Sequence, residues 1–276
     1  MHNYFRQLRE DIILGKFLNN PKIQQINYGL NKWGLDPIKF LTSLKPTVLF
    51  YRDFLHYKKL SRLHKVNQGP ISWSPQLGNL NEGAGISYGH YFLQDLIVAR
   101  RIFEENPVQH VDIGSRIDGF IAHLLVFRKV KIIDIRKLES FDKNLDYATG
   151  DAMNLFTFAD NSIESISSLH AIEHFGLGRY GDPLNPTGHI QALREIQRVL
   201  KKDGYFYLSF PAGIPRVLFN DKRIVDVRLP EQVMNECDLV EFIAIPGMGK
   251  PHYKAVPEDF RNDEGYCGLW IFKKRP

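Results

Sequence analysis

From about residue 90 to the C-terminus, short apolar segments alternate with segments whose apolar residues recur at helical spacing. Two parallel strands need a long crossover between them, and that crossover is usually a helix. The alternation therefore predicts an α/β fold with a seven-stranded, mainly parallel sheet and helices on both faces. The expected strands lie within 108–114, 130–135, 144–152, 162–170, 205–211, 239–245 and 267–274. The last two have no clear helix between them and are expected to pair antiparallel at one side of the sheet.

The helical pattern is clearest in three segments, 91–106, 117–127 and 187–202. In the third, Lys201 and Lys202 suit the negative end of the helix dipole. Asp203 and the glycine after it are expected to end that helix, because a glycine commonly follows a helix C-terminus.

Residues 1–80 lack this alternation, and we expect them to form a mostly helical, partly irregular extension before an α/β domain at 81–276. The stretch 69–85 is rich in Gly, Pro, Ser and Asn and is typical of a loop or linker. Within 45–66, five basic residues stand among aromatic ones: Arg52, Lys58, Lys59, Arg62 and Lys65. They indicate either a basic helix in peripheral contact with a membrane or anionic partner, or an ordinary solvated helix face.

The bulk composition is that of a globular protein, with 43% hydrophobic and 24% charged residues and a net charge of +5. This mild positive charge allows an anionic small-molecule or glycan acceptor but gives no reason to expect a nucleic acid partner. The two cysteines show no disulfide or metal spacing, and residues 1–17 show no signal-peptide pattern. No apolar run approaches the roughly 20 residues that span a bilayer. The expected location is therefore the cytoplasm, and the sequence leaves the oligomeric state open.

The segment "HVDIGSRIDGF" at 110–120 reads as a strand, a tight turn and the start of a helix, as in many nucleotide-binding folds. A phosphate-binding P-loop is excluded, because Gly119 is followed by Phe120 rather than by Lys and Ser or Thr. A dinucleotide site is disfavoured, because the middle glycine between Gly114 and Gly119 is missing. S-adenosylmethionine has no pyrophosphate, so an acid at the strand end and one open glycine suffice for it, and Asp112 and Gly114 supply them.

An acid follows each of three successive expected strands: Asp112, Asp134 and Asp151. We expect Asp134 to accept hydrogen bonds from both ribose hydroxyls of S-adenosylmethionine, and Asp151 to accept from the adenine amine. Each acid alone has the simpler interpretation of a turn-capping residue, but together they predict one adenosine site at the carboxyl ends of the strands. The same site is expected to include Gly114, Ser115, Ile135, Ala152 and Leu169.

The segment "SSLHAIEHFGLGRYGD" follows the fourth expected strand, where we expect the acceptor. A neutral imidazole suits proton removal near pH 7, so His174 is the first candidate base, oriented by Glu173, and His170 is the second. The alternative is that these side chains only tie the loop together. The expected acceptor-binding residues are Arg179, Tyr180, Asp182 and Arg223. Lys222 and Arg223 either face an anionic acceptor together or form an exposed surface pair.

The spacing His170-x-x-Glu173-His174 also matches a zinc-protease pattern. That pattern belongs on a long helix, whereas here Gly176 and Gly178 follow at once, so we predict no resident metal ligands. A Mg²⁺ ion that assists transfer through Asp182 stays open as an additional cofactor.

Three stretches, "VDIGSRIDGFIAHLL", "DNSIESISSLHAIEHFGLGRYGD" and "VLFNDKRI", resemble a bacterial methyltransferase-like family of unknown function that is associated with surface-polysaccharide genes. The resemblance runs from about residue 85 to the C-terminus and includes "EIQRVLKKDGYFYLSFP", which is similar to class I methyltransferases. It implies a Rossmann-like fold and S-adenosylmethionine-dependent O-methylation of a sugar or glycan-linked small molecule. Because the glycine turn is atypical, the alternative is a non-catalytic scaffold subunit of a glycan-assembly complex.

Overall fold

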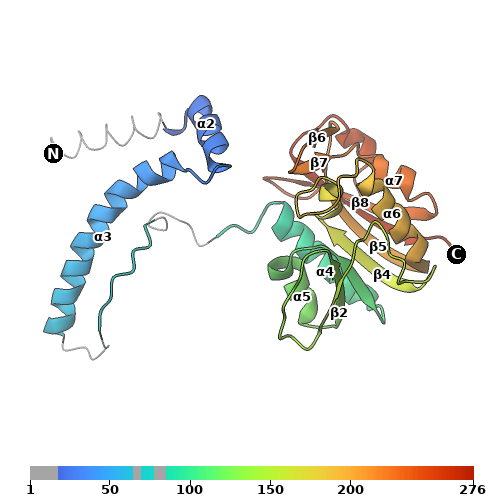
Figure 1. Ribbon diagram of the computed structural model, residues 1–276, viewed down its shortest axis with the longest axis horizontal. Coiled ribbons are helices and arrows are strands. Elements are labelled where there is room, and N and C mark those ends of the chain that lie inside the picture. The colour runs from blue at the N-terminus through green and yellow to red at the C-terminus, as the bar shows by residue number, and fades with distance from the viewer. Residues whose placement is uncertain (1–17, 65–69, 78–84) are drawn as a thin grey trace. The chain divides into compact units, whose positions relative to one another are not determined.

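The computed structural model describes residues 18–64, 70–77 and 85–276, and the chain divides into two compact units, Met1–Gly85 and Ile86–Pro276 (Figure 1). The domain boundary expected at 80/81 falls outside the described residues. So do residues 1–17, where a signal peptide was not expected, and parts of the expected linker at 69–85 and of the basic segment at 45–66.

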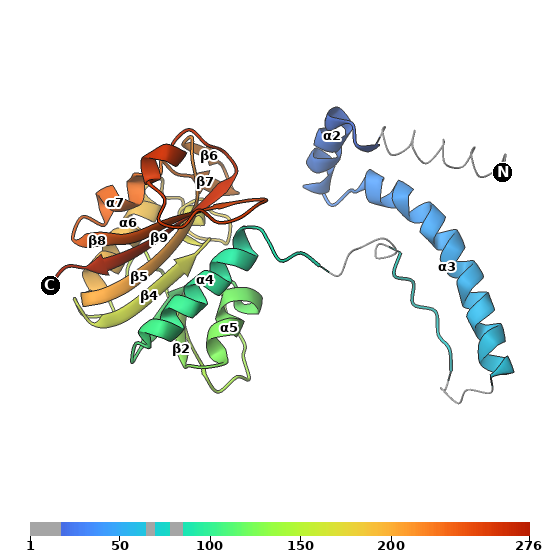
Figure 2. The same ribbon diagram turned by 180° about the vertical axis from the view of Figure 1, so that it is seen from behind.

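The first unit contains helices α2 (Pro21–Asn31) and α3 (Pro37–Leu63). Asn20 and Asp36 cap them, because each side chain accepts a hydrogen bond from a backbone N–H of the first turn. Trp73 stacks on two aromatic rings of α3, so the segment 70–77 lies along this helix (Figure 2). No helix in the described part of the chain is long and apolar enough to cross a bilayer. Peripheral membrane contact through 45–66 stays a prediction.

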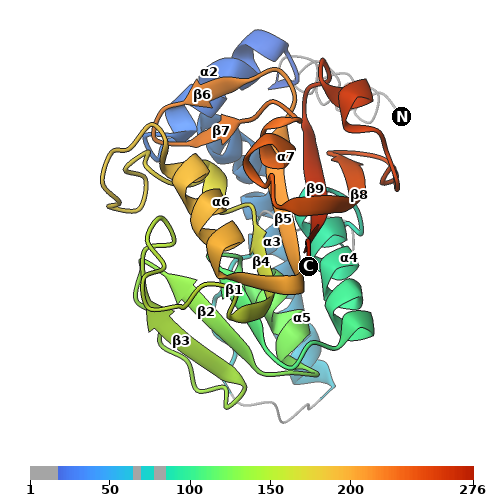
Figure 3. The same ribbon diagram turned by 90° about the vertical axis from the view of Figure 1, so that its right-hand side faces the viewer.

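The second unit is built on a seven-stranded sheet in the order β3-β2-β1-β4-β5-β9-β8 (Figure 3). Its strands are β1 (His110–Ile113), β2 (Val130–Asp134), β3 (Leu145–Thr149), β4 (Ile163–Leu169), β5 (Leu200–Ala212), β8 (Cys237–Pro246) and β9 (Tyr266–Lys274). Strands β1 to β5 run parallel to one another, and β9 lies antiparallel between β5 and β8. The expected mainly parallel sheet with a terminal antiparallel pair is thus confirmed.

Helices cover both faces of the sheet, as expected. The main ones are α4 (His90–Glu105), a π-helical turn η2 (Ile117–Ile121) that leads into α5 (Ala122–Leu125), α6 (Gly188–Val199) and α7 (Leu229–Val233). Helices α4 and α5 pack on one face, where Ile102 and Leu124 are fully buried. Helix α6 packs on the other face through Leu193 and Ile196, which are also fully buried. Two short 3₁₀ helices complete the unit, η3 (Ile172–His174) and η4 (Pro257–Phe260).

Two sequence-based expectations need correction. Helix α6 ends at Val199 and β5 begins at Leu200, so Lys201 and Lys202 do not belong to the helix. The sheet register explains this, because Leu200 already pairs with Ile163 of β4 before the chain bulges out. A two-stranded hairpin, β6 (Arg216–Leu218) with β7 (Lys222–Ile224), was also not expected.

Candidate active site

A cavity of about 980 Å³ lies at the carboxyl ends of the parallel strands. Residues 114–118 after β1, 134–138 after β2 and 150–153 after β3 line one part, which we call the acid side. Helix α4, the segment after β4 and the β6–β7 hairpin line the other part, which we call the histidine side. Strand order reverses between β1 and β4, and ligands of open α/β sheets bind at such a reversal.

Hydrogen bonds among its own residues and to β4 hold the turn after β1 in place. Gly114 has a φ of +68°, and a Cβ there would lie 3.1 Å from the Cβ of Ala171, so a side chain would strain the turn. The backbone N–H and hydroxyl of Ser115 donate hydrogen bonds to Asp112, and so does the hydroxyl of Ser167 on β4. These bonds bind the turn to the neighbouring strand.

Asp112 therefore does not line the cavity, contrary to the expectation that it faces the adenosine. It is fully buried. Burial raises the pKa of its carboxyl to about 6, although the hydrogen bonds from Ser115 and Ser167 oppose that rise. Leu169 is likewise buried and off the cavity wall, and its N–H donates to the Ser115 hydroxyl. Both residues shape the turn and leave the wall to Gly114 and Ser115.

The other two acids do line the cavity. Asp134 accepts hydrogen bonds from the backbone N–H, Nε and Nη2 of Arg136, at 2.9, 2.9 and 2.6 Å. Asp151 accepts one bond, from the N–H of Met153 at 2.9 Å, and has no ionic partner among the described residues. Ile135 and Ala152 line the cavity beside them. The acid side therefore offers two carboxylates from the tips of adjacent strands, one of them covered by an arginine.

Arg136 was missed by sequence reasoning. Its guanidinium also lies 4.5 Å from the ring centre of Tyr180, on the loop that follows η3. The Asp-x-Arg spacing after a strand was the one available signal, because a bidentate pair across two residues is sterically easy at a strand end.

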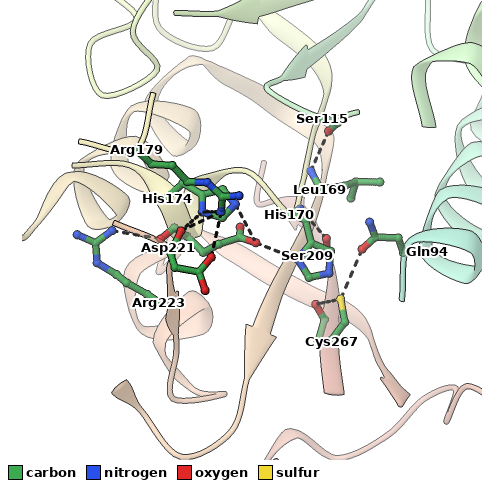
Figure 4. A network of polar contacts seen from close by, with 12 residues as sticks. Gln94, Ser115, Leu169, His170, His174, Arg179, Ser209, Asp221, Arg223 and Cys267 are labelled. Atoms are coloured by element: carbon green, nitrogen blue, oxygen red, sulfur yellow. Dashed lines mark hydrogen bonds and ion pairs between the residues drawn. The ribbon is translucent and has the colours of Figure 1, made fainter. Parts of the chain in front are cut away.

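On the histidine side, His170 is buried in a left-handed backbone conformation, with a φ of +50°. Its N–H donates to the carbonyl and hydroxyl of Ser209 on β5, which hold it in place. Its Nδ1 lies 2.9 Å from Oε1 of Glu173 (Figure 4). Burial by itself lowers the pKa of His170, but the neighbouring Cys267 and Glu173 outweigh it and raise the pKa well above its usual value. His170 is therefore a cation near neutral pH.

His174 is held differently. Its Nδ1 lies 2.6 Å from the carbonyl oxygen of Asp221 and 3.2 Å from Nη1 of Arg179. Because a carbonyl only accepts, the shorter contact assigns the proton to Nδ1, while Arg179 donates to the same carbonyl. Nε2 then carries the free lone pair and lies 3.8 Å from Oε1 of Glu173. Burial lowers the pKa of His174, partly opposed by Glu173. His174 is therefore neutral near pH 7.

The loop after η3 is firmly bonded. Asp182 accepts hydrogen bonds from the N–H groups of Gly176, Gly178 and Tyr180. Burial favours a higher pKa for Asp182, but these backbone bonds lower it below the usual value. Arg179 donates to the carbonyl and the carboxylate of Asp221. Asp182 and Arg179, which were expected to bind the acceptor, both line the cavity, but the loop already engages the carboxylate of Asp182 and Nη1 of Arg179.

Arg223 also has a role other than the one expected. It is buried, does not line the cavity, and donates to the carbonyls of Glu173 and Phe175 at 3.3 and 2.6 Å. It ties the hairpin to the loop behind the two histidines. Tyr180 does line the cavity, with its ring edge against His174 at a centroid distance of 5.7 Å.

Lys222, which together with Arg223 was expected either to face an anionic acceptor or to be exposed, lines the histidine side. Two further residues of this side were not expected, His90 and Tyr91. The rings of His90 and Tyr91, at the start of α4, lie 6.0 and 4.8 Å from the ring of His170. Nothing in the local sequence marks them, because they reach the cavity only through the packing of α4. Among the described residues, no cluster of three or more His, Cys, Asp or Glu side chains is arranged to hold a metal.

A family model described as "Caenorhabditis protein of unknown function, DUF268" matches residues 129–242. This span runs from β2 into β8 and contains the loop after η3 and both hairpin strands. The expected likeness to a family of unknown function is thus found in part of the chain, without support for a bacterial origin or a polysaccharide association. None of the curated proteins matches the sequence.

Several solved structures are similar to the chain. The [4+2]-cyclase SpnF matches with a TM-score of 0.50 at 14% identity, over 76% of this chain and 85% of its own. Burkholderia thailandensis 1,6-didemethyltoxoflavin-N1-methyltransferase, with bound S-adenosylhomocysteine, gives 0.48 at 12% identity, over 82% and 89%. The N-methyltransferase NodS from Bradyrhizobium japonicum WM9, in complex with S-adenosylhomocysteine, gives 0.47 at 11% identity, over 74% and 94%.

The second unit shares a Rossmann-like α/β fold with SpnF. At these identities the likeness establishes the architecture, while the reaction must be argued from the site. In this fold, the two cavity acids come from the tips of β2 and β3, and the two histidines follow β4.

Proposed function

We propose that the second unit is an S-adenosylmethionine-dependent methyltransferase that methylates a hydroxyl oxygen of a small molecule, a sugar or a glycan-linked compound. The observation that carries this proposal is one cavity walled by Asp134 and Asp151 on one side and by a neutral His174 on the other. Its volume of about 980 Å³ is near the top of the range for small-molecule sites, about 300–1,000 Å³. That leaves room for a cofactor and an acceptor together.

The residues of the acid side fit the cofactor. Gly114 presents open backbone to the cavity, Asp134 can accept from ribose hydroxyls, and Asp151 has a free carboxylate oxygen for the adenine amine. Ile135, Ala152 and Met153 provide apolar surface for a planar base. When bound, S-adenosylmethionine supplies an activated methyl group, so the protein mainly has to position the two reactants.

His174 is the proposed general base. Its Nδ1–H is fixed on the Asp221 carbonyl, which leaves Nε2 to take the proton of an acceptor hydroxyl. The positive charge that forms on the ring is stabilised by Glu173, whose Oε1 lies 3.8 Å from Nε2. His170 is unsuited to this step, because its raised pKa keeps it protonated.

An oxygen acceptor follows from this base, because a hydroxyl must lose a proton as it is methylated. The chain also lacks the Asn/Asp-Pro-Pro-aromatic signature of enzymes that methylate planar amines. The sugar or glycan as acceptor, and a role in surface-polysaccharide synthesis, rest only on the family resemblance of the sequence. An assisting Mg²⁺ would need ligands other than Asp182, whose carboxylate the loop backbone occupies.

A second candidate is a non-catalytic binding or scaffold subunit that keeps the fold. Two observations favour it: the turn after β1 lacks the middle glycine, and Arg136 already covers the ribose-binding acid. The cyclase SpnF is a reminder that one fold hosts different activities.

Calorimetric titration of the full chain with S-adenosylhomocysteine separates the two candidates. The methyltransferase proposal expects a dissociation constant in the micromolar range, from about 1 to 100 μM, with NAD as a non-binding control. No binding up to millimolar concentration would overturn it in favour of the scaffold.

In the same sample, imidazole ¹⁵N shifts at pH 7 should show His174 neutral with its proton on Nδ1, and His170 as imidazolium. The reverse assignment would remove His174 as the base.

A further inference from the structure

The cations of the cavity wall are almost all neutralised. Arg116, Arg136, Arg179 and Arg216 each pair with a carboxylate of the cavity wall. Two lysines of the wall have no ion pair or side-chain hydrogen bond among the described residues, Lys137 and Lys222. Lys137 is exposed, whereas Lys222 is half-buried at the start of β7. Lys222 is therefore the unpaired charge that the fold shields from water.

No acid of the histidine side is free to pair with Lys222. Asp221, its neighbour in the chain, holds Arg179, and Glu264 on the cavity wall holds Arg216. Glu173 lies 2.9 Å from His170. A half-buried ammonium without a counter-charge loses hydration without recovering it. An arriving anion would restore the balance.

His90 adds a second unsatisfied group in the same place. Its Nε2 is buried and has no hydrogen-bond partner among the described residues, and its ring stacks beside that of His170. Burial, the charge of His170 and the charge of Lys222 lower the pKa of His90, and a hydrogen bond to the backbone of Gly265 opposes them. Because Nε2 has no partner among the described residues, that bond uses the proton on Nδ1, so Nε2 of the neutral ring is a hydrogen-bond acceptor. It can receive a hydroxyl of the ligand but cannot donate to an anionic oxygen.

We propose that the histidine side contains an oxyanion subsite, in which Lys222 binds a carboxylate or phosphate group of the acceptor while Nε2 of His90 accepts a hydrogen bond from a hydroxyl of the same ligand. The identification of this ligand as the methyl acceptor rests on the proposed function, whereas the anion binding itself does not. An ammonium is a compact point charge without the planar fork of a guanidinium, so this subsite accepts either oxyanion. Arg179, the anion ligand expected from the sequence, is already engaged with Asp221. The substrate class is thus a hydroxyl compound that carries a negative charge.

The test uses three probes of similar size: glucuronate, glucose 1-phosphate and neutral glucose. Each is titrated into the full chain with and without S-adenosylhomocysteine, and chemical shift changes give its affinity. Lys222→Met is the test variant, and Lys137→Met removes the other unpaired lysine as a matched control. Lys222→Arg keeps the charge, and circular dichroism confirms that the variants are folded.

At least one charged probe should bind wild type about tenfold or more tightly than glucose, as expected for one charge-assisted hydrogen bond. Lys222→Met should remove that preference, while Lys222→Arg and Lys137→Met retain it, and a comparison of glucuronate with glucose 1-phosphate shows which oxyanion is favoured. Equal affinity for all three probes, or an unchanged preference in Lys222→Met, overturns the subsite. If S-adenosylhomocysteine does not bind but the Lys222-dependent preference persists, the subsite stands and the proposed methyl transfer falls. If S-adenosylhomocysteine binds without that preference, the reverse holds.

Discussion

The acid side and the histidine side of the cavity differ in how far apart in the sequence their hydrogen-bond partners lie. On the acid side, Asp134 and Asp151 each accept hydrogen bonds from the residue two positions later in the chain. On the histidine side, His174 donates to a carbonyl 47 residues away, and Arg223 reaches a carbonyl 48 residues away. The first side is therefore assembled as each strand ends, whereas the second exists only after β4, the loop after η3 and the hairpin have met.

This difference makes the proposed cofactor binding on the acid side independent of the contacts that position the proposed base on the histidine side. Carboxylates placed by local turns need only the sheet to bring them together, so the acid side should tolerate changes elsewhere. The tautomer of His174 depends on Asp221, a residue of the distant hairpin turn. The position of the loop after η3 also depends on the hairpin, because Arg223 of β7 donates a hydrogen bond to the carbonyl of Phe175. Changes in the loop or hairpin should therefore disturb the histidine side while leaving the acid side able to bind.

The largest effect is expected from Gly176→Ala in the loop. A Cβ at Gly176, where φ is +76°, would lie 2.0 Å from the carbonyl oxygen of Asn185, so backbone must move. We expect a loss of about 3 kcal/mol or more in the free energy of unfolding, from overpacking and left-handed strain together. Urea denaturation measures it.

Gly181→Ala is the matched control for that variant. Gly181 has a similar φ of +82° but nothing within 4 Å of its missing Cβ, so it reports the backbone strain alone, about 1 kcal/mol. An equal loss of unfolding free energy in the two variants would show that the loop backbone moves easily and that the histidine side is not rigidly packed.

The next largest effect is expected from Asp134→Ala on the acid side. It removes the acceptor of two ribose hydrogen bonds to a charged group, each contributing about 1.5–3 kcal/mol, so the affinity for S-adenosylhomocysteine should fall about 100-fold. Calorimetry measures it, and Asp118→Ala, an exposed acid of the same cavity wall, should stay within about twofold. An unchanged affinity in Asp134→Ala would place the ribose elsewhere.

The smallest effect, about 1.4 kcal/mol for each pH unit, is an opposite pH dependence of the stability contributed by His110 and by His170. His110 is buried under the turn after β1 between the hydroxyls of Ser165 and Ser167. Burial lowers its pKa to about 3. Its contribution to stability is present above its unfolded pKa of about 6.5 and is lost on acidification toward 3, by about 1.4 kcal/mol per pH unit.

His170 has a raised pKa, so its contribution is present below about 6.5 and is lost as the pH rises through the folded value. Urea denaturation of wild type, His110→Gln and His170→Asn from pH 4.5 to 8.5 compares the two. The stability advantage of wild type over His110→Gln should shrink on acidification, and that over His170→Asn should shrink on alkalinisation. Parallel curves for both variants would mean that the two rings do not differ in charge.

The same contrast explains what the sequence could predict. Seven strands, their mainly parallel order and the acids at the tips of β2 and β3 follow from local patterns. Asp112 and Asp134 occur in the same pattern, yet only Asp134 reaches the cavity. The cause is partly local and partly non-local: Ser115 donates two hydrogen bonds to the carboxylate of Asp112, and the hydroxyl of Ser167, with which Asp112 pairs in register on β4, donates another.

The roles of Arg223 and Lys222 were unpredictable for a related reason. They are neighbours on β7, and strand alternation sends one side chain behind the loop and the other to the cavity. The hairpin itself was not expected, so nothing indicated which of the two would face a ligand. Similarly, the end of α6 is decided by the pairing of Leu200 with β4 rather than by the Asp-Gly signal.

The two cysteines offer a further use. Both are free thiols in the sheet, Cys237 at the start of the edge strand β8 and Cys267 wholly enclosed in β9. A thiol reagent can attack each one only after the surrounding backbone opens. Cys237 should react after fraying of the edge strand β8, and Cys267 only after β9 separates from its neighbours β8 and β5. The two cysteines therefore serve as internal probes of local unfolding, and the ratio of their labelling rates reports how cooperatively the sheet unfolds.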